Sequence, residues 1–405
     1  MRAERKGLRE RSAIANEPAQ ARLYVRTLKL TDFRNYARAE LKLDARPVVL
    51  VGENGSGKTN LLEAVSLLGA GHGLRGRPYG ELCRKGGAGG FAVAAKVVSG
   101  GDEVEIGTGI PAGSREETSG RTVRIAGKEE SAGALSEHVK IVWLIPAMDG
   151  LFTGPASERR RFLDRLVLAI DPKMRSPLGR YDRAMRQRNR LFQLREGSRA
   201  LFEGLEEQMA EAGVAIAAAR REAVARLVAL IERMREERGP GPFPFALLAL
   251  EGRLEAELAA RSATEVEDEF REGLANGRER DRAAARALEG PHLSDLIVSH
   301  GPKEAPAQEC SSGEQKALLI GLILAKAELI KEVEGLPPLV LLDEVAAHLD
   351  QARREALFAE IARLGGQAWM TGTDADLFAP LGASSQVFSV AGGKVTREEG
   401  ASTAA

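Results

Sequence analysis

Apolar and polar residues alternate near the start of the chain, over residues 23–30 with the sequence LYVRTLKL. Alternation with a period of two is typical of a β-strand that buries one face. The segment PVVLV at 47–51 is apolar throughout, which is typical of a parallel strand covered on both faces. Three further strand-like segments, at 91–98, 102–107 and 121–126, are separated by Gly, Ser and Glu residues and predict a small antiparallel sheet.

Between residues 154 and 289 the spacing of apolar residues becomes helical, and Ala, Arg, Glu and Leu dominate. One helical face collects Leu205, Met209, Ile216, Ala219, Ala223, Leu227, Ile231 and Met234. This helix must end at the sequence GPGPFPF, residues 239–245, because proline lacks the backbone N–H that a helix interior needs. The segment as a whole predicts a helical lobe.

An alternation of helices and strands returns after residue 290. We expect a long helix from Ser311, an apolar strand at 339–344, a helix from Asp350 and a strand at 367–371. The predicted fold class is α/β, with one domain built from both ends of the chain, an antiparallel β subdomain and an inserted α-helical lobe. The predicted parts are an N-terminal extension at 1–22, the first half of the domain at 23–153, the lobe at 154–289, the second half at 290–395 and a tail at 396–405.

Composition and charge limit the possible functions only slightly. Of the 405 residues, 29% are charged and 43% are apolar, which is ordinary for a soluble folded protein. The formal net charge is zero, so affinity for nucleic acid would have to come from local basic patches. Cys83 and Cys310 are isolated and have no companion histidine at ligand spacing, which argues against a disulfide framework or a zinc site. A reducing compartment, the cytoplasm, fits this pattern.

No segment predicts insertion into a membrane. The longest apolar run, residues 317–325, is much shorter than the roughly 20 residues that a membrane span requires. Residues 1–22 contain charges but lack the apolar core of a secretory signal. We expect them to be a disordered tail or an incorrectly assigned translation start, with a basic arm that contacts nucleic acid as the alternative.

The clearest motif is GENGSGKT at residues 52–59, which fits the phosphate-loop pattern G-x-x-x-x-G-K-[ST] at every fixed position. It follows an apolar strand and precedes a helical segment, which is the context that the motif requires. Lys58 is expected to reach the β and γ phosphates of ATP, and the Thr59 hydroxyl to bind Mg²⁺. The predicted nucleotide-binding residues of this segment are Gly52, Glu53, Asn54, Gly55, Ser56, Gly57, Lys58, Thr59 and Asn60.

Two carboxylates, Asp343 and Glu344, end the apolar strand PLVLLDE. Ligands of open α/β sheets bind at the carboxyl ends of strands. Asp343 is therefore predicted to join Thr59 at Mg²⁺, and Glu344 to orient or deprotonate the attacking water. A pair of acids that caps a helix is the alternative, and the phosphate loop in the same chain favours the catalytic interpretation.

A second helix start, in ECSSGEQKALLIGLILAKAEL, has the unpaired N–H groups that attract an anion. Together with the phosphate loop and the Asp-Glu strand, it resembles the signature motif of ABC-type ATPase heads. The resemblance implies that this motif faces the γ-phosphate of ATP bound to the other subunit, and that AHLD at 347–350, with Asp350, crosses the same interface. The signature residues are Ser311, Ser312, Gly313, Glu314 and Gln315.

Four segments narrow the resemblance to the bacterial RecF family of DNA repair ATPases, over nearly all of residues 23–395. They are LKLTDFRNYARAELKL, CSSGEQK, YDRAMRQRNRLF and PLVLLDEVAAHLD. The resemblance implies weak DNA-stimulated ATP hydrolysis, an ATP-dependent homodimer, and binding of DNA duplexes and of single-strand/duplex junctions. It also implies recombination mediator partners and a recombinase that is loaded at single-strand gaps.

The same resemblance implies that Arg34 and Asn35, in FRNY, lie near the nucleotide; turn-forming surface residues are the alternative. Arg75 occupies the place of a family arginine that follows the loop helix. The usual Ser-Phe before it is replaced here by Gly73 and Leu74, which weakens that assignment.

A basic segment covers residues 151–200, with 13 Lys or Arg against 5 Asp or Glu. Such residues predict salt-sensitive binding to DNA phosphates with little sequence preference, and a solvated helix face is the alternative. The DNA-binding candidates are Arg159, Arg160, Arg161, Arg183, Arg186, Arg188 and Arg190.

Two other functions compete with DNA repair. A transporter ATPase is disfavoured because the strand segment QAWMTGT at 367–373 lacks the switch histidine of that class. An SMC-like DNA tether requires heptads over hundreds of residues, whereas the insert here is short and is broken by GPGP at 239–242.

Overall fold

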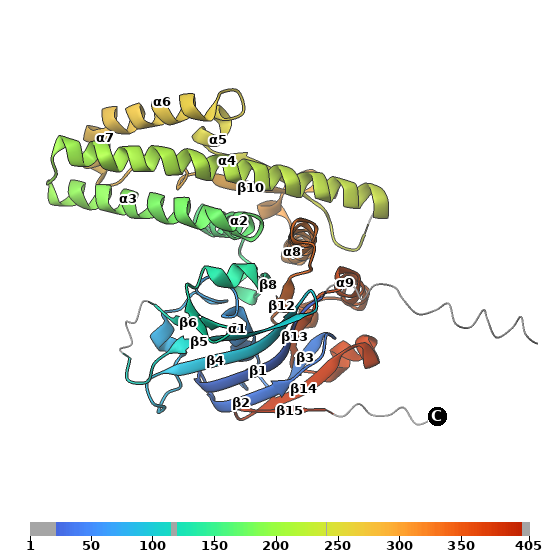
Figure 1. The fold of residues 1–405 in the computed structure, drawn as a ribbon. Helices are drawn as coiled ribbons and strands as arrows, with labels where there is room; N and C mark the ends of the chain where they lie inside the picture. Colours follow the sequence, from blue (N-terminus) through green and yellow to red (C-terminus); the bar gives the residue numbers. More distant parts are fainter. Residues whose placement is uncertain (1–21, 115–119, 240, 399–405) are drawn as a thin grey trace, which may run out of the picture.

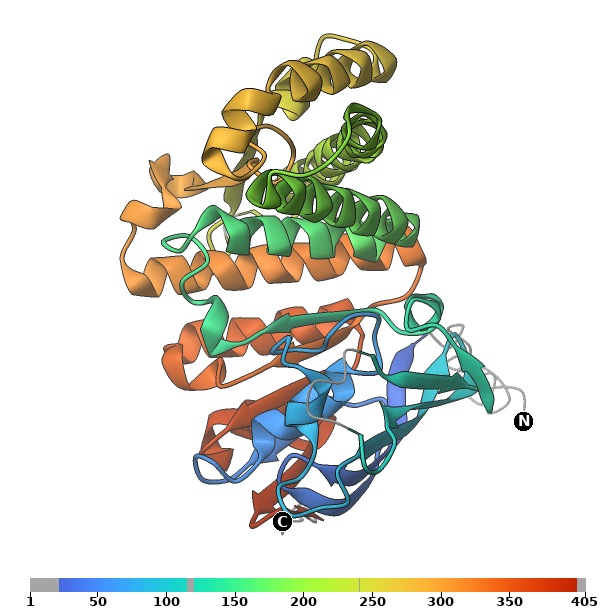
Figure 2. The same ribbon diagram turned by 90° about the vertical axis from the view of Figure 1, so that its left-hand side faces the viewer.

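The structure is a computed structural model that describes residues 22–114, 120–239 and 241–398. Nearly all of the predicted N-terminal extension and most of the predicted tail lie outside the described residues. Two six-stranded sheets occupy the lower half of the molecule, and a stack of helices lies above them (Figures 1 and 2).

The first sheet is antiparallel, as predicted. Its order is β2-β1-β4-β5-β6-β7. Its strands are β1 (Leu23–Phe33), β2 (Tyr36–Lys42), β4 (Phe91–Ser99), β5 (Asp102–Ile110), β6 (Thr122–Ile125) and β7 (Lys128–Glu130). The apolar residues Leu28 and Leu30 of β1 are buried, whereas Lys29 between them is exposed, which confirms the half-buried strand.

The second sheet is mixed and mostly parallel, with the order β15-β14-β3-β13-β12-β8. Its strands are β3 (Val48–Val51), β8 (Ile141–Leu144), β12 (Leu339–Leu342), β13 (Ala368–Gly372), β14 (Gln386–Ala391) and β15 (Lys394–Arg397). All residues of β3, β12 and β13 are buried, because helices and the first sheet cover this layer. Strand β3 lies between β13 and β14, so the two ends of the chain form one sheet, as predicted.

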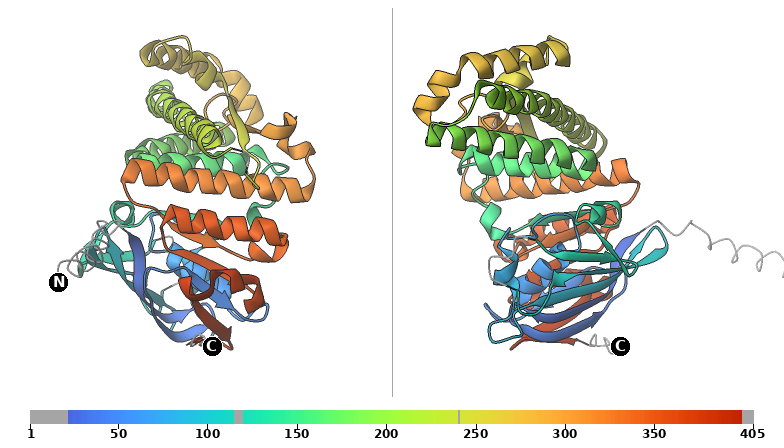
Figure 3. Two further views of the ribbon diagram at one scale, coloured as in Figure 1. Left: turned by 90° about the vertical axis from the view of Figure 1, so that its right-hand side faces the viewer. Right: turned by 60° about the vertical axis from the view of Figure 1, so that its left-hand side comes forward.

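Three helices belong to this α/β part: α1 (Lys58–Ser66), α8 (Ser312–Glu334) and α9 (Gln351–Leu364). Helix α8 runs above α9 and below the upper helices, and it contacts both layers (Figure 3). The upper helices are α2 (Ala156–Ile170), α3 (Arg175–Leu194), α4 (Arg199–Arg238), α5 (Arg253–Glu257), α6 (Ala263–Asn276) and α7 (Arg278–Ala284). No helix in the described ranges combines the length and the apolarity that crossing a membrane would require.

Helix α4 ends at Arg238, directly before the Gly-Pro sequence that was predicted to stop it. The lobe is not helical throughout, however. Strand β9 (Ala246–Glu251) pairs with β10 (Asp295–His300), which in turn pairs with β11 (Ala305–Pro306). The composition ALLALE favours a helix, and pairing with β10 overrides that preference. The predicted boundary between the lobe and the second half of the domain, at residue 290, therefore lies between β9 and β10, although these two strands are hydrogen-bonded to each other.

Candidate nucleotide-binding site

The phosphate loop connects the end of β3 to the start of α1 at Lys58. Gly57 caps the helix with a φ of 117°, a conformation that side chains rarely adopt. A Cβ atom at this position would also lie 2.5 Å from Asn35 Nδ2 and 2.6 Å from the Tyr36 hydroxyl. The second fixed glycine of the motif is therefore required by the backbone conformation and by the close approach of Asn35 and Tyr36.

Lys58 lies within the loop and is only 4% exposed. Its Nζ donates hydrogen bonds to the carbonyl oxygens of Gly52 at 2.6 Å and of Glu53 at 2.9 Å. Burial lowers the pKa of Lys58, and the nearby carboxylates of Glu344 and Asp343 oppose that shift. The ammonium group is thus held at the centre of the loop, where phosphate oxygens can replace the two carbonyls as its acceptors.

Asp343 follows β12 and lies beside Thr59, although the two are distant in the sequence. Its Oδ1 accepts hydrogen bonds from the Thr59 hydroxyl at 3.0 Å and from the Thr371 hydroxyl at 2.8 Å. Burial raises the pKa of Asp343, and the two hydroxyl donors oppose that rise. The structure therefore brings together the carboxylate and the hydroxyl that were predicted to bind Mg²⁺.

This donor set fits Mg²⁺. Within residues 22–114, 120–239 and 241–398, no three His, Cys, Asp or Glu side chains form a cluster that would hold a metal by themselves. Mg²⁺ normally takes one or two protein oxygens and completes its shell with phosphates and water. Thr59 and Asp343 provide such oxygens at the end of the phosphate loop, and a cation beside them would also offset the cost of burying the carboxylate.

Glu344 has a left-handed backbone with a φ of 54°, which is unusual for a residue with a side chain. Its backbone N–H donates to Thr371 Oγ1 at 2.8 Å, so the same threonine holds both acidic residues. Its carboxylate has no hydrogen-bond or ion-pair partner among the described residues, and it remains available to accept a proton from water.

Thr371, at the end of β13, is a site residue that the sequence did not reveal. Strand β13 lies between β3 and β12, so its carboxyl end faces both motifs. The only signal was the pair of threonines in QAWMTGT.

Glu63 is a second residue that was missed. It lies on α1, is 2% exposed, and pairs with Arg34 through contacts of 2.8 and 3.1 Å. Arg75 Nη1 reaches the same carboxylate at 3.2 Å and Asn60 Oδ1 at 3.2 Å. A buried acid in the apolar helix NLLEAVSLL was the available signal.

Asn35 contacts the loop directly, because its Nδ2 donates to the Ser56 carbonyl at 3.1 Å and its Oδ1 accepts from Asn60 at 2.8 Å. Arg34 is oriented instead by Glu63 and by the Glu81 carbonyl. Asn35 of the FRNY segment thus contacts the phosphate loop, whereas Arg34 pairs with Glu63 on the helix that follows the loop.

The signature segment forms the start of α8. Ser311 caps the helix in a reciprocal pair with Glu314, whose Oε2 accepts from the Ser311 N–H at 3.1 Å. Lys303 lies 2.6 Å from Glu314, and this ion pair together with the capping bonds lowers the pKa of Glu314 to about 2. Ser311, Ser312 and Gly313 are exposed, and no hydrogen bond or ion pair joins them to residues 52–59 in the described chain.

Gln315 of the signature segment and Asp350 both form hydrogen bonds that stabilise a helix start. Gln315 Nε2 donates to the carbonyl oxygens of Gln308 and Cys310, which fixes the turn before the helix. Asp350 is exposed and caps α9, because its Oδ1 accepts from the Arg353 N–H at 2.8 Å.

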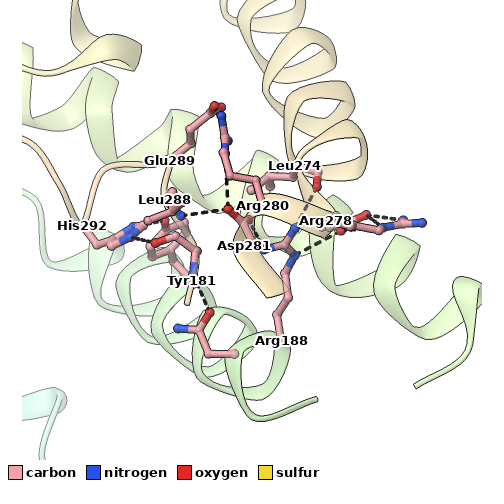
Figure 4. A network of polar contacts seen from close by, with 12 residues as sticks. Tyr181, Arg188, Leu274, Arg278, Arg280, Asp281, Leu288, Glu289 and His292 are labelled. Atoms are coloured by element: carbon pink, nitrogen blue, oxygen red, sulfur yellow. Dashed lines mark hydrogen bonds and ion pairs between the residues drawn. The ribbon is translucent and has the colours of Figure 1, made fainter. Parts of the chain in front are cut away.

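The prediction that Arg188 contacts DNA is wrong. Its side chain is 0% exposed and donates to Glu206 at 3.1 Å, to Asp281 at 2.6 Å and to the Leu274 carbonyl at 2.7 Å (Figure 4). This network joins α3, α4, α6 and α7 inside the lobe. Counting charges along the sequence did not reveal it, because the carboxylate partners are distant in the chain.

Arg159 and Arg160 are also engaged within the protein. Arg159 forms a bidentate pair with Asp295 at 2.8 and 2.7 Å, and Arg160 donates to the Ser294 carbonyl at 2.7 Å. The remaining candidates are exposed: Arg161, Arg183, Arg186 and Arg190. Arg161 and Arg186 pair with Glu158 and Asp182 at the surface, where such pairs leave the guanidinium accessible.

Comparisons with known proteins cover nearly the whole chain. Residues 24–396 match the family described as the RecF/RecN/SMC N-terminal domain. The DNA replication and repair protein RecF of Mesorhizobium japonicum is 54% identical over 387 residues, which cover 95% of this chain and 100% of that protein. The protein of the same name from Rhizobium leguminosarum bv. trifolii is 52% identical over 91% of this chain and 97% of its own length.

A solved structure of the recombination mediator protein RecF with ATPrS, in the RecFOR pathway, has the same fold. It superposes with a TM-score of 0.80 at 22% identity, and covers 94% of this chain and 99% of that one.

Proposed function

The chain belongs to the RecF family of DNA replication and repair proteins, and we propose that it is an ATP-dependent DNA-binding ATPase of recombinational repair in the cytoplasm. It would dimerise on ATP, engage DNA at single-strand gaps and help to load a recombinase. The observation that carries this proposal is the meeting of Lys58, the Thr59–Asp343 pair and Glu344 at the carboxyl ends of β3 and β12.

ATP hydrolysis follows from the roles of these residues. Lys58 stabilises the negative charge that grows on the transferred phosphoryl group. Thr59 and Asp343 would hold Mg²⁺, which would supply positive charge to offset the negative charge of the phosphates. Glu344 orients a water molecule and accepts its proton, because its carboxylate has no competing partner in the described chain. Thr371 bonds to the Asp343 carboxylate and to the Glu344 backbone N–H, and so holds the two acidic residues in position relative to each other.

ATP-dependent dimerisation is supported by the exposed start of α8. The helix spans 23 residues, and its first-turn N–H groups near Ser312 and Gly313 are positioned to bind an anion. The phosphate loop of the same subunit already has its own helix start at α1. The signature motif is therefore available to the γ-phosphate held by a second subunit, and two equivalent sites would close a symmetric dimer with Asp350 at the interface.

DNA binding is assigned to the exposed arginines Arg161, Arg183, Arg186 and Arg190 of α2 and α3. They would contact phosphates, which gives affinity with little sequence preference. Duplexes, single-strand/duplex junctions, recombination mediator proteins and a recombinase are the proposed partners.

The test compares ATP hydrolysis with and without gapped DNA. Gapped DNA should raise the turnover of the wild-type protein, whereas Lys58→Ala should abolish ATP binding. Glu344→Gln should retain ATP binding and lose about 10²–10⁴-fold in turnover, the range for removal of a general base. Turnover of the Gln variant at the wild-type rate would refute the role of Glu344, and a lack of ATP binding by the wild-type protein would refute the proposed function.

A further inference from the structure

A cavity of about 1160 Å³ lies next to the nucleotide site, between the end of the second sheet and helices α2, α3 and α8. Thr59 and Asp343, the proposed Mg²⁺ ligands, form part of its wall, so the cavity reaches the place where the metal and the terminal phosphate are proposed to bind. Its lining also includes Arg165 of α2, Arg175 at the start of α3 and Lys326 of α8. None of these three cations has been assigned a function above.

Lys326 is the most unusual of the three. It lies in the middle of α8, is only 5% exposed and lines the cavity. Its Nζ has no hydrogen-bond or ion-pair partner in the described parts of the chain; its nearest charge-stabilising contact is the ring of Phe162, at 4.9 Å. Burial lowers the pKa of Lys326 well below its usual value, and the like charge of Arg165 lowers it further. An ammonium group in such a place is costly unless an anion accompanies it.

The neighbouring arginines are in the same situation. Arg165 stacks over Trp143 at 5.4 Å, and neither Arg165 nor Arg175 has a carboxylate partner among the described residues. Burial lowers the pKa of both guanidinium groups. Asp164, also in the wall, forms its ion pair with Arg220 at 2.8 Å, and together with Glu158 it offsets only part of the lowering of the Arg165 pKa. Glu158 and Asp343 also line the cavity, where Glu158 pairs with Arg161. The seven Lys and Arg side chains of the lining therefore outnumber its three carboxylates.

The anion that this cavity can receive is identified by its position. A small dianion is produced at the γ-phosphate side of the nucleotide site, which is the side that opens into the cavity. We propose that the cavity binds the inorganic phosphate released by ATP hydrolysis, with Lys326, Arg165 and Arg175 as its counter-charges. This inference rests on the proposed ATPase function. Occupation would pair charges on α2, α3 and α8 at once, so the phosphate would be held between the nucleotide site and the helical lobe.

Inorganic phosphate is the probe, and its binding is measured by calorimetry on the full chain loaded with Mg²⁺ and ADP. Lys326→Met should weaken phosphate binding about tenfold or more, the loss expected for one charge-assisted hydrogen bond. Lys331→Met is the matched control, because it makes the same change on α8 at a residue that does not line the cavity. Equal phosphate affinity in Lys326→Met and wild type would overturn the proposal.

Thermal unfolding provides a second readout. Phosphate should raise the melting temperature of the wild type by mass action, and this increase should disappear in Lys326→Met and shrink in Arg175→Gln. Without phosphate, Lys326→Met should be at least as stable as wild type, because it removes an unpaired buried charge. A phosphate-dependent increase that is equal in all variants would refute the site.

Single-turnover kinetics tests whether the bound phosphate is the product. In the wild type, phosphate should appear in solution after bond cleavage with a measurable lag, which Lys326→Met should shorten. An unchanged lag would overturn the product assignment. ATP binding should remain normal in Lys326→Met and Lys331→Met, so failure of the cavity site is distinguishable from failure of the ATPase function.

Discussion

Arg188 and Arg190 provide the sharpest contrast between the sequence and the structure. Both lie on α3, two residues apart, and both were candidates for DNA binding on charge alone. Arg188 is fully buried, whereas Arg190 is exposed and has no ion-pair partner in the described chain. Replacing each by methionine therefore removes the same charge from two different environments.

The cost of Arg188→Met follows from the groups that it leaves behind. Glu206 retains Arg278 as a close partner. Asp281 loses its contact at 2.6 Å and retains a backbone donor, Leu288 N–H, and a distant cation, Arg280 at 3.9 Å. Breaking a buried ion pair from one side typically costs about 3–5 kcal/mol, and the unpaired Asp281 places this variant in that range. Adding Asp281→Asn should restore part of the loss, because the uncompensated charge is then removed.

Urea unfolding and DNA titration at several salt concentrations separate the two arginines. Arg188→Met should lose free energy of unfolding, whereas Arg190→Met should remain within about 0.5 kcal/mol of wild type. Arg190→Met should reduce the slope of log K against log salt by about 0.9 if it removes one duplex phosphate contact. The reasoning is refuted if Arg188→Met unfolds like wild type and reduces the DNA salt slope as Arg190→Met does.

Three further predictions concern the ATPase site. Ser311→Arg should retain ATP binding and lose ATP-dependent dimerisation in light scattering, because a bulky cation blocks closure; normal dimers would contradict the signature role. Thr371→Val should slow hydrolysis more than it weakens ATP binding, since it releases Asp343 and the Glu344 backbone; equal losses would contradict a positioning role. Glu314→Gln should lower stability at neutral pH, and the difference should shrink as pH falls from about 4.3 toward the folded pKa of about 2; a difference that grows on acidification would contradict the low pKa.

The elements that the sequence predicted well are those whose signal is local. Strands β3 and β12 are continuous apolar segments, and the glycine pattern of residues 52–59 requires the loop that the structure has. The end of α4 follows from Gly-Pro chemistry alone. In contrast, β9 owes its conformation to pairing with β10, more than 40 residues later, and no local pattern contains that information.

The site shows the same division. Lys58 and Thr59 could be identified from the phosphate-loop motif, and Asp343 from its position after an apolar strand. Thr371 and Glu63 act through partners that strand order and helix packing bring close. A role that depends on a distant partner cannot be derived from residue type, which is also why Arg188 was assigned to DNA.

The basic segment 151–200 therefore combines three different uses of positive charge. Arg188 is internal, Arg175 lines the phosphate cavity at the start of α3, and Arg183 and Arg190 face solvent farther along the same helix. At 1.5 Å per residue, Arg175 lies about 12 Å from Arg183 and about 22 Å from Arg190 along the axis. Both separations exceed the Debye length of about 8 Å at physiological salt, so charge alone transmits little between phosphate and DNA. Strong reciprocal coupling between these two ligands would therefore require movement of α3 as a rigid element.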